Sequence, residues 1–222
     1  MGTTGTRRRK PAGDETGAGD TRAALLAAGR RAFAASGFEA ASVRAITAEA
    51  GATLGAITYH FGSKEGLYEA VVASCVEPLV ERVTQTAALP VPPLERAEAV
   101  VRAFMTHLLD NPDLPRLMLH QLLRTGRPPD AAARAIRRML QRLAEVVAEG
   151  QAERTVRPGP PPLVAMALVS HPLHLAVVRP ALQAVAGLDL SDADTRALAL
   201  ENAVRFAHHG LAAQPGDWEA ER

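Results

Sequence analysis

Few residues in this chain of 222 could carry enzyme or metal chemistry. Ser170 and His171 are neighbours on one predicted helix, and adjacent helical side chains do not face each other, so they do not form a nucleophile and its base. His174 lies one turn beyond His171, and another predicted helix carries His208 and His209. No carboxylate or cysteine accompanies these histidines at metal-ligand spacing, which favours interface or half-exposed histidines over a metal site. We therefore expect no catalytic residue, no enzyme activity, no metal and no cofactor.

The single cysteine and the apolar runs indicate the compartment. Cys75 alone cannot form an intramolecular disulfide or a multi-cysteine zinc module, and its position favours a buried apolar residue over a redox sensor. The longest uninterrupted apolar stretch, Leu163 to Val169, is far shorter than the ~18 residues that suggest a membrane span. The N-terminus is polar where a signal peptide needs an apolar segment. We expect a cytoplasmic protein with no membrane partner.

A different chemistry, hydrogen bonding to phosphate, is available to one short segment. Tyr59, His60 and Lys64 offer phenolic, imidazole and ammonium donors, and Lys64 is one of only two lysines in the chain. The formal net charge is only +1, so a nucleic-acid function must depend on such a local surface and not on the charge of the whole molecule.

The elements that would position these donors are short helices. Apolar residues recur at helical spacing, Ser or Thr stands where each later helix would begin, and Gly stands where each of the first three would end. The predicted helices run from Thr21 to Gly37, from a Ser42 cap to Gly51, from a Thr53 cap to Gly62, and onward from a Ser63 cap through Leu67, Tyr68, Val71 and Val72.

Two short helices that follow a longer one match the helix-turn-helix plan, in which the second short helix lies in the DNA major groove. The detailed sequence resembles the N-terminal DNA-binding domain of TetR-family transcriptional regulators over residues 21–72. The motif residues include Phe33 to Phe38 and the run Ile57-Thr58-Tyr59-His60-Phe61-Gly62-Ser63-Lys64-Glu65-Gly66-Leu67-Tyr68. The Tyr-His-Phe run looks like one subgroup, some members of which carry a C-terminal domain similar to that of CecR-type regulators.

The resemblance also implies which residues contact DNA. The third helix contains no Arg, Asn or Gln, so base readout is thin. Arg44 is the best candidate for a guanine contact, and apolar groups on the third helix could meet thymine methyls. Gly55 lowers helix propensity by up to ~1 kcal/mol, which suits either a close approach of bare backbone to DNA or a tolerated surface glycine. The matching positions are Arg44, Thr53, Leu54, Gly55, Ala56, Thr58, Tyr59, His60 and Lys64.

The rest of the chain reads as further helices separated by proline, with no strand-like alternation. We expect these helices at about 94–110, 114–124, 130–153, 163–178 and 192–213. Residues 1–19 lack Leu, Ile, Val and aromatics, and their basic run at 7–10 is either a solubilising tail or an arm for the minor groove. The predicted domains are a disordered basic arm at 1–19, a helix-turn-helix domain at 20–66, an effector-binding and dimerisation domain at 67–213 and a tail at 214–222.

The predicted fold class is all-α: an N-terminal three-helix helix-turn-helix DNA-binding domain followed by a helical ligand-binding and dimerisation domain. The resemblance implies an effector pocket lined by Phe104, His107, Met118, Gln121, Leu122 and Met139, with Met105, His120 and Arg124 nearby. The last two helices are apolar over much of their circumference, which suits either a dimer interface or closure of the monomer core. The interface candidates are Leu168, Leu175, Val178, Leu198, Val204 and Leu211.

The sequence thus predicts a DNA-binding transcriptional regulator that reads a palindromic operator as a homodimer. That it is a repressor, released by an unknown small-molecule effector, is implied by the resemblance alone. Because few side chains of the third helix could contact base edges, an alternative stays open. In it, a helical protein binds DNA without sequence preference or acts only through a ligand.

Overall fold

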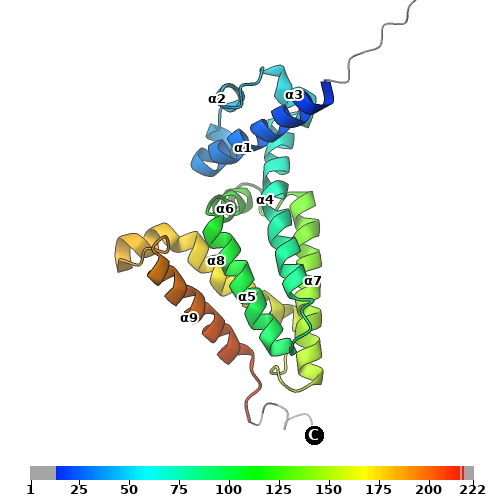
Figure 1. Ribbon diagram of the computed structural model, residues 1–222, viewed down its shortest axis with the longest axis vertical. Coiled ribbons are helices and arrows are strands. Elements are labelled where there is room, and N and C mark those ends of the chain that lie inside the picture. The colour runs from blue at the N-terminus through cyan, green and yellow to red at the C-terminus, as the bar shows by residue number, and fades with distance from the viewer. Residues whose placement is uncertain (1–13, 216, 218–222) are drawn as a thin grey trace, which may run out of the picture. The chain divides into compact units, whose positions relative to one another are not determined.

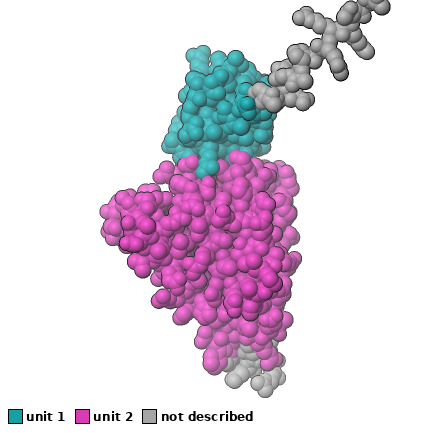
Figure 2. Space-filling model, in the orientation of Figure 1, with its two compact units in different colours: residues 1–71 teal, residues 72–222 magenta. Residues whose placement is uncertain are grey.

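The computed structural model describes residues 14–215 and 217, so the predicted basic run at 7–10 and residues 216 and 218–222 lie outside the described part. The chain divides into two compact units, residues 1–71 and 72–222 (Figure 2). Apart from one isolated β-bridge between Val156 and Ala212, the regular structure of the described residues is helical, which confirms the all-α prediction. The helices are α1 Asp14–Ala40, α2 Val43–Glu49, α3 Gly55–Phe61, α4 Lys64–Thr86, α5 Pro93–Asp110, α6 Asp113–Thr125, α7 Asp130–Ala152, α8 Pro161–Ala186 and α9 Ala193–Leu211 (Figure 1).

An aromatic cluster forms the core of the first unit. The ring of Tyr68 meets those of Phe33 and Phe38 edge-on, with centroids 5.0 and 5.3 Å away. Ile46 from α2 and Ile57 from α3 are buried, and both short helices contact α1. Because a domain this small has little apolar surface to bury, the three large rings supply a substantial share of its core.

Local hydrogen bonds fix where the short helices begin. Ser42 Oγ accepts from the Ala45 N–H at 3.4 Å and Ser63 Oγ from the Gly66 N–H at 3.0 Å, so both serine caps are confirmed. The predicted Thr53 cap is wrong, because α3 has Leu54 at its N-cap and no side-chain capping bond. Leu54 is already in a helical conformation, and the Thr53 carbonyl accepts from the Ala56 N–H at 3.0 Å.

The ends of α1 differ from the predicted ones. This helix begins at Asp14, so residues 14–19 of the predicted disordered arm are helical. Adding turns to a helix whose later residues are packed costs little, and the anchoring residues Leu25 and Phe33 are fully buried. Gly37 kinks the helix with φ 74 and ψ 178 and does not end it, because glycine adopts positive φ without steric cost. The border between units, at 71 and 72, also differs from the predicted 66 and 67.

The second unit is a bundle in which α5 packs against α7, α8 and α9, and α7 packs against α8 (Figure 1). Helix α8 continues past the predicted end at 178 and includes Pro172 and Pro180. Among the described residues it is the one helix whose length and composition would suit a membrane span, with a mean hydropathy of 1.5 over 18 residues. The prediction that the chain has no membrane span considered only uninterrupted apolar runs. Polar residues such as Ser170 keep every such run within α8 short.

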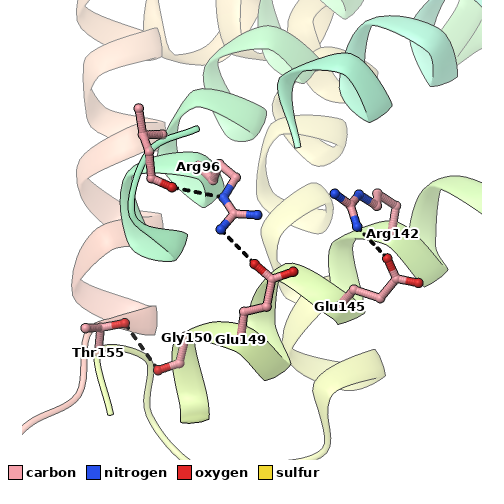
Figure 3. A network of polar contacts seen from close by, with 7 residues as sticks. Arg96, Arg142, Glu145, Glu149, Gly150 and Thr155 are labelled. Atoms are coloured by element: carbon pink, nitrogen blue, oxygen red, sulfur yellow. Dashed lines mark hydrogen bonds and ion pairs between the residues drawn. The ribbon is translucent and has the colours of Figure 1, made fainter. Parts of the chain in front are cut away.

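Polar contacts fasten one end of this bundle (Figure 3). Arg96 at the start of α5 donates to the Val91 carbonyl at 3.1 Å and pairs with Glu149 of α7 at 2.7 Å. Thr155 Oγ1 donates to the Gly150 carbonyl at 3.2 Å. A side chain at Gly150 would bring its Cβ within 2.5 Å of a Val156 methyl, so this packing requires glycine. The Arg96–Glu149 pair joins the start of α5 to the end of α7, and the contacts of Gly150 hold the segment that follows α7.

Candidate nucleic-acid interface

The outer faces of α2 and α3 carry most of the predicted DNA-contacting residues. Arg44, Thr53 and Thr58 are exposed, while Ala56 and His60 are half-buried. The most exposed apolar groups are Leu54, with 52% of its surface accessible, and Tyr59, with 81%. An exposed leucine and tyrosine on one short helix, whose other side packs into the core through Ile57, indicate a surface that contacts a partner.

The glycines of this region differ in what requires them. A Cβ at Gly66 would lie 2.0 Å from the Phe61 carbonyl oxygen, so the passage from α3 to α4 tolerates only glycine there. A Cβ at Gly55 would meet nothing within 4 Å. Packing within the protein therefore does not explain Gly55, and bare backbone is exposed at the start of α3.

Lys64 has a second role that the sequence did not indicate. Its ammonium donates to the Glu39 carbonyl at 3.2 Å and lies 4.7 Å from the centre of the Phe38 ring. These contacts join the start of α4 to the end of α1, so Lys64 is half-buried and held in place. An ammonium has three N–H donors, so this arrangement is compatible with a phosphate contact as well.

Arg22 is a cation that sequence reasoning missed. This exposed residue of α1 lies with its guanidinium carbon 5.2 Å from the centre of the Phe61 ring, at the end of α3. No helical spacing could have shown the contact, because the two residues are 39 positions apart. Residues 50–64 contain no carboxylate, and the preceding Glu49 is paired with Arg31 at 2.5 Å. Helix α3 itself therefore carries no carboxylate to repel phosphate, and the next one along the chain is Glu65 in the first turn of α4.

Two family models match this chain. The model for "Bacterial regulatory proteins, tetR family" covers residues 25–71, and the model for "Tetracyclin repressor-like, C-terminal domain" covers residues 93–206. The chain belongs to the TetR family. Members of this family are DNA-binding transcription regulators and not enzymes, so the predicted recognition and fold are confirmed. The CecR-type subgroup stays a prediction.

Solved structures share the TetR fold at low sequence identity. A TetR-family regulatory protein from Rhodococcus is 22% identical, with a TM-score of 0.71 over 87% of this chain and 98% of that one. A TetR-family regulator from Marinobacter aquaeolei is 21% identical, with a TM-score of 0.71 over 90% and 99%. The ketosteroid transcriptional regulator of Mycobacterium tuberculosis is 18% identical, with a TM-score of 0.69 over 87% and 95%. No curated protein matches the sequence.

An apolar cavity of about 160 Å³ lies within the second unit. Of the predicted pocket residues, Phe104, Met118, Leu122 and Met139 line it. The lining also includes residues of α4 and α8 that sequence reasoning missed. These are Val76, Leu79, Val80, Met166, Val169 and Leu173.

Two predicted pocket residues, His107 and Gln121, are buried but do not line the cavity. The Gln121 amide donates to Thr125 Oγ1 at 3.0 Å and to the Arg127 carbonyl at 3.2 Å, so it fastens the end of α6. Buried polar groups occupy places where hydrogen-bond partners exist, and a fully apolar cavity provides none. For this reason the prediction that placed them in the pocket is wrong.

The predicted interface residues fall into two groups. Three of them are buried inside the second unit and close its core: Leu168, Val204 and Leu211. The prediction that these three lie in a dimer interface is wrong. Leu175 and Val178 are half-buried, and Leu198 is 73% exposed. Other exposed apolar residues of this region are Leu163, Leu173, Val185, Leu188 and Phe206.

The histidines of α8 and α9 have other neighbours than a metal. Among the described residues, no three His, Cys, Asp or Glu side chains gather as metal ligands would. The His171 ring packs on Phe206 with 4.7 Å between centroids, and His208 Nδ1 lies 2.6 Å from a carboxylate oxygen of Glu98. Burial lowers the pKa of His171 below its ordinary value of 6.5, and His174 nearby lowers it further.

Proposed function

We propose that this TetR-family regulator is a cytoplasmic repressor that binds a palindromic operator as a homodimer and leaves it when a small molecule occupies the cavity of the second unit. The observation that carries the proposal is the exposed face of α3. Leu54, Gly55, Thr58 and Tyr59 all reach the surface there, on a segment without carboxylates.

Contacts on this face divide into positioning and reading. Tyr59, Lys64 and Arg22 supply donors and cations for phosphates, which fix the protein on the duplex without reading its sequence. Arg44 is exposed near the start of α2 and has the two-pronged donor geometry that matches the O6 and N7 atoms of guanine. The methyl groups of Leu54 and Thr58 suit the methyl group of thymine.

The exposed apolar residues of α8 and α9 support the homodimer. Leu198 and Phe206 on α9 and Val185 near the end of α8 expose apolar surface that a second copy would cover. A two-fold dimer presents two α3 helices, which is why the operator would be an inverted repeat with half-sites about 34–36 Å apart or a multiple of that distance.

Release by a ligand requires that the ligand bind one conformation better than the other. Helix α4 is suited to carry that difference, because it is one continuous helix from Lys64 to Thr86 and supplies Val76, Leu79 and Val80 to the cavity lining. A ligand that moves these residues acts on the same helix whose first turn holds Lys64.

The test is a footprint of the full-length protein on DNA flanking its own coding region, with competitor DNA, at two salt concentrations. We expect a protected inverted repeat that survives the competitor. Protection that disappears with competitor at the higher salt would contradict the proposal and support the alternative, a binder without sequence preference.

A further inference from the structure

We propose that the cavity of the second unit binds a flexible hydrocarbon chain of about six to eight carbons, whose uncharged polar end lies at the apolar mouth of the cavity. The role of such a molecule as effector rests on the function proposed above. Its chemical class rests on the cavity alone.

The lining excludes charge. All fifteen lining residues are apolar, and no polar atom is exposed to the cavity. No polar side chain lines the cavity, so a buried carboxylate or phosphate would find no side-chain donor there and a buried ammonium would find no opposite charge. A ligand that fits must place carbon and hydrogen there and nothing that depends on hydrogen bonds.

The volume and the residue types define the shape. A dry cavity of about 150 Å³ holds a molecule the size of benzene, and this one measures about 160 Å³. Three methionines from three helices, Met118, Met139 and Met166, contribute to the lining, and their flexible side chains adapt to a bent chain and make room for further carbons. Phe104 is the only aromatic lining residue, so stacking gives a flat ring little advantage over a chain.

The burial of the lining residues shows in which direction a bound hydrocarbon chain would lie. Val76, Leu79 and Leu108, from α4 and α5, are buried and form the deep end. Leu122 of α6 and Met166 and Leu173 of α8 line the cavity yet are exposed. The mouth therefore lies between α6 and α8. A polar end group would lie there among apolar side chains, where a carboxylate loses more hydration free energy than a hydroxyl group does.

The test compares ligands that share a size and differ in one property, by calorimetric titration of the full-length protein at pH 8. The probes are 1-octanol, octanoate and the flat 1-naphthol. We expect 1-octanol to bind at least tenfold more tightly than octanoate and more tightly than 1-naphthol, with a negative heat-capacity change. Octanoate or 1-naphthol binding as tightly as 1-octanol would overturn the proposal.

Two neighbouring leucines of α6 provide a matched pair of variants for the mouth. Leu122 lines the cavity and is 45% exposed, whereas Leu123 does not line it and is 79% exposed. Leu122→Lys places an ammonium at the mouth, so the preference for octanol over octanoate should fall at least tenfold. Leu123→Lys should leave that preference unchanged. The same change in both variants, or none in either, contradicts the proposed mouth.

A third variant fills the interior. Val169 is buried in the lining, and Val169→Phe occupies the space a chain would use, so octanol affinity should fall at least tenfold while the thermal midpoint stays within a few degrees. If the variant keeps wild-type affinity, octanol binds elsewhere and the proposal is wrong. If it does not fold, the α6 pair still decides.

Operator release is measured separately, so the two proposals fail in different ways. Octanol that binds with the expected preference but leaves the operator complex intact contradicts ligand release and leaves the ligand class standing. A protein that binds its operator and prefers octanoate contradicts the ligand class and leaves the regulator standing.

Discussion

Among single residues, His171 makes stability depend on pH. Its Nε2 atom is buried and has no hydrogen-bond partner among the described residues. His171 and Arg157 line one small pocket of the second unit. Burial lowers the pKa of His171 below 6.5, and His174 lowers it further. The unfolded chain therefore binds a proton more readily than the folded one. The stability that neutral His171 contributes is fully present above about pH 6.5. It is lost as the pH falls through the window between 6.5 and the lower pKa of His171 in the folded state.

Thermal unfolding between pH 7.5 and 5.5 should show this loss as a falling midpoint. In His171→Leu the fall should be smaller, because the variant has no imidazole to protonate. A control, His120→Leu, removes an exposed histidine of α6 and should keep the wild-type slope. An unchanged slope in His171→Leu would show that other groups cause the dependence.

Arg44 and Lys64 should affect DNA binding in different ways. Arg44→Ala removes a base contact, so base preference at one position of each half-site should relax, at a cost of about 1–3 kcal/mol for the preferred base. Lys64→Ala removes a phosphate contact and should weaken binding to all sequences about equally. It should also destabilise the first unit by about 0.5–1 kcal/mol, through loss of the contact with Phe38. Affinities for a set of operators that differ by single base pairs measure both effects on DNA binding. An equal loss of affinity for every operator in the Arg44→Ala variant would contradict the assignment of base reading to Arg44.

At the scale of elements, substitution by alanine should have opposite effects on stability at two glycines, Gly55 at the start of α3 and Gly66 in the first turn of α4. Gly66→Ala forces a Cβ onto the Phe61 carbonyl oxygen and should cost about 1–3 kcal/mol of stability. Gly55→Ala adds a methyl group to open space and should leave stability equal or up to ~1 kcal/mol higher, because alanine favours helix.

Operator affinity distinguishes the two interpretations of Gly55. We expect Gly55→Ala to weaken operator binding at least tenfold, because the added methyl group occupies the space between backbone and DNA. Full affinity in a stably folded Gly55→Ala variant would instead identify a tolerated surface glycine.

The elements that sequence predicts well are those determined by neighbouring residues. The caps at Ser42 and Ser63 involve residues three positions apart, and the apolar pocket residues Phe104 and Met139 follow helical periodicity. Sequence missed contacts between residues far apart in the chain, such as those of Lys64 with the Glu39 carbonyl and of Arg22 with Phe61. It also failed where two local signals compete, because α8 continues past Pro180 and ends only at Gly187, which is left-handed. Gln121 donates to the Arg127 carbonyl in the loop after α6, which helical periodicity does not show.

At the scale of the whole molecule, recognition of an inverted repeat requires two copies. Leu198 of α9 is 73% exposed and belongs to the proposed interface. Leu198→Glu should produce a monomer, measured by sedimentation, with at least tenfold weaker operator binding and unchanged helix content. The control Leu123→Glu changes an equally exposed leucine of α6 and should stay dimeric. A dimeric Leu198→Glu variant would place the interface elsewhere.

The central claim is that this TetR-family protein reads a specific DNA sequence, and selection from a random duplex library tests it most directly. Full-length protein is incubated with the library and excess competitor at about 0.15 M salt, and the bound fraction is sequenced over several rounds. The account predicts enrichment of one inverted repeat, with thymines in its half-sites that face Leu54 and Thr58 and a guanine that faces Arg44. A bound pool that stays random after all rounds would contradict it.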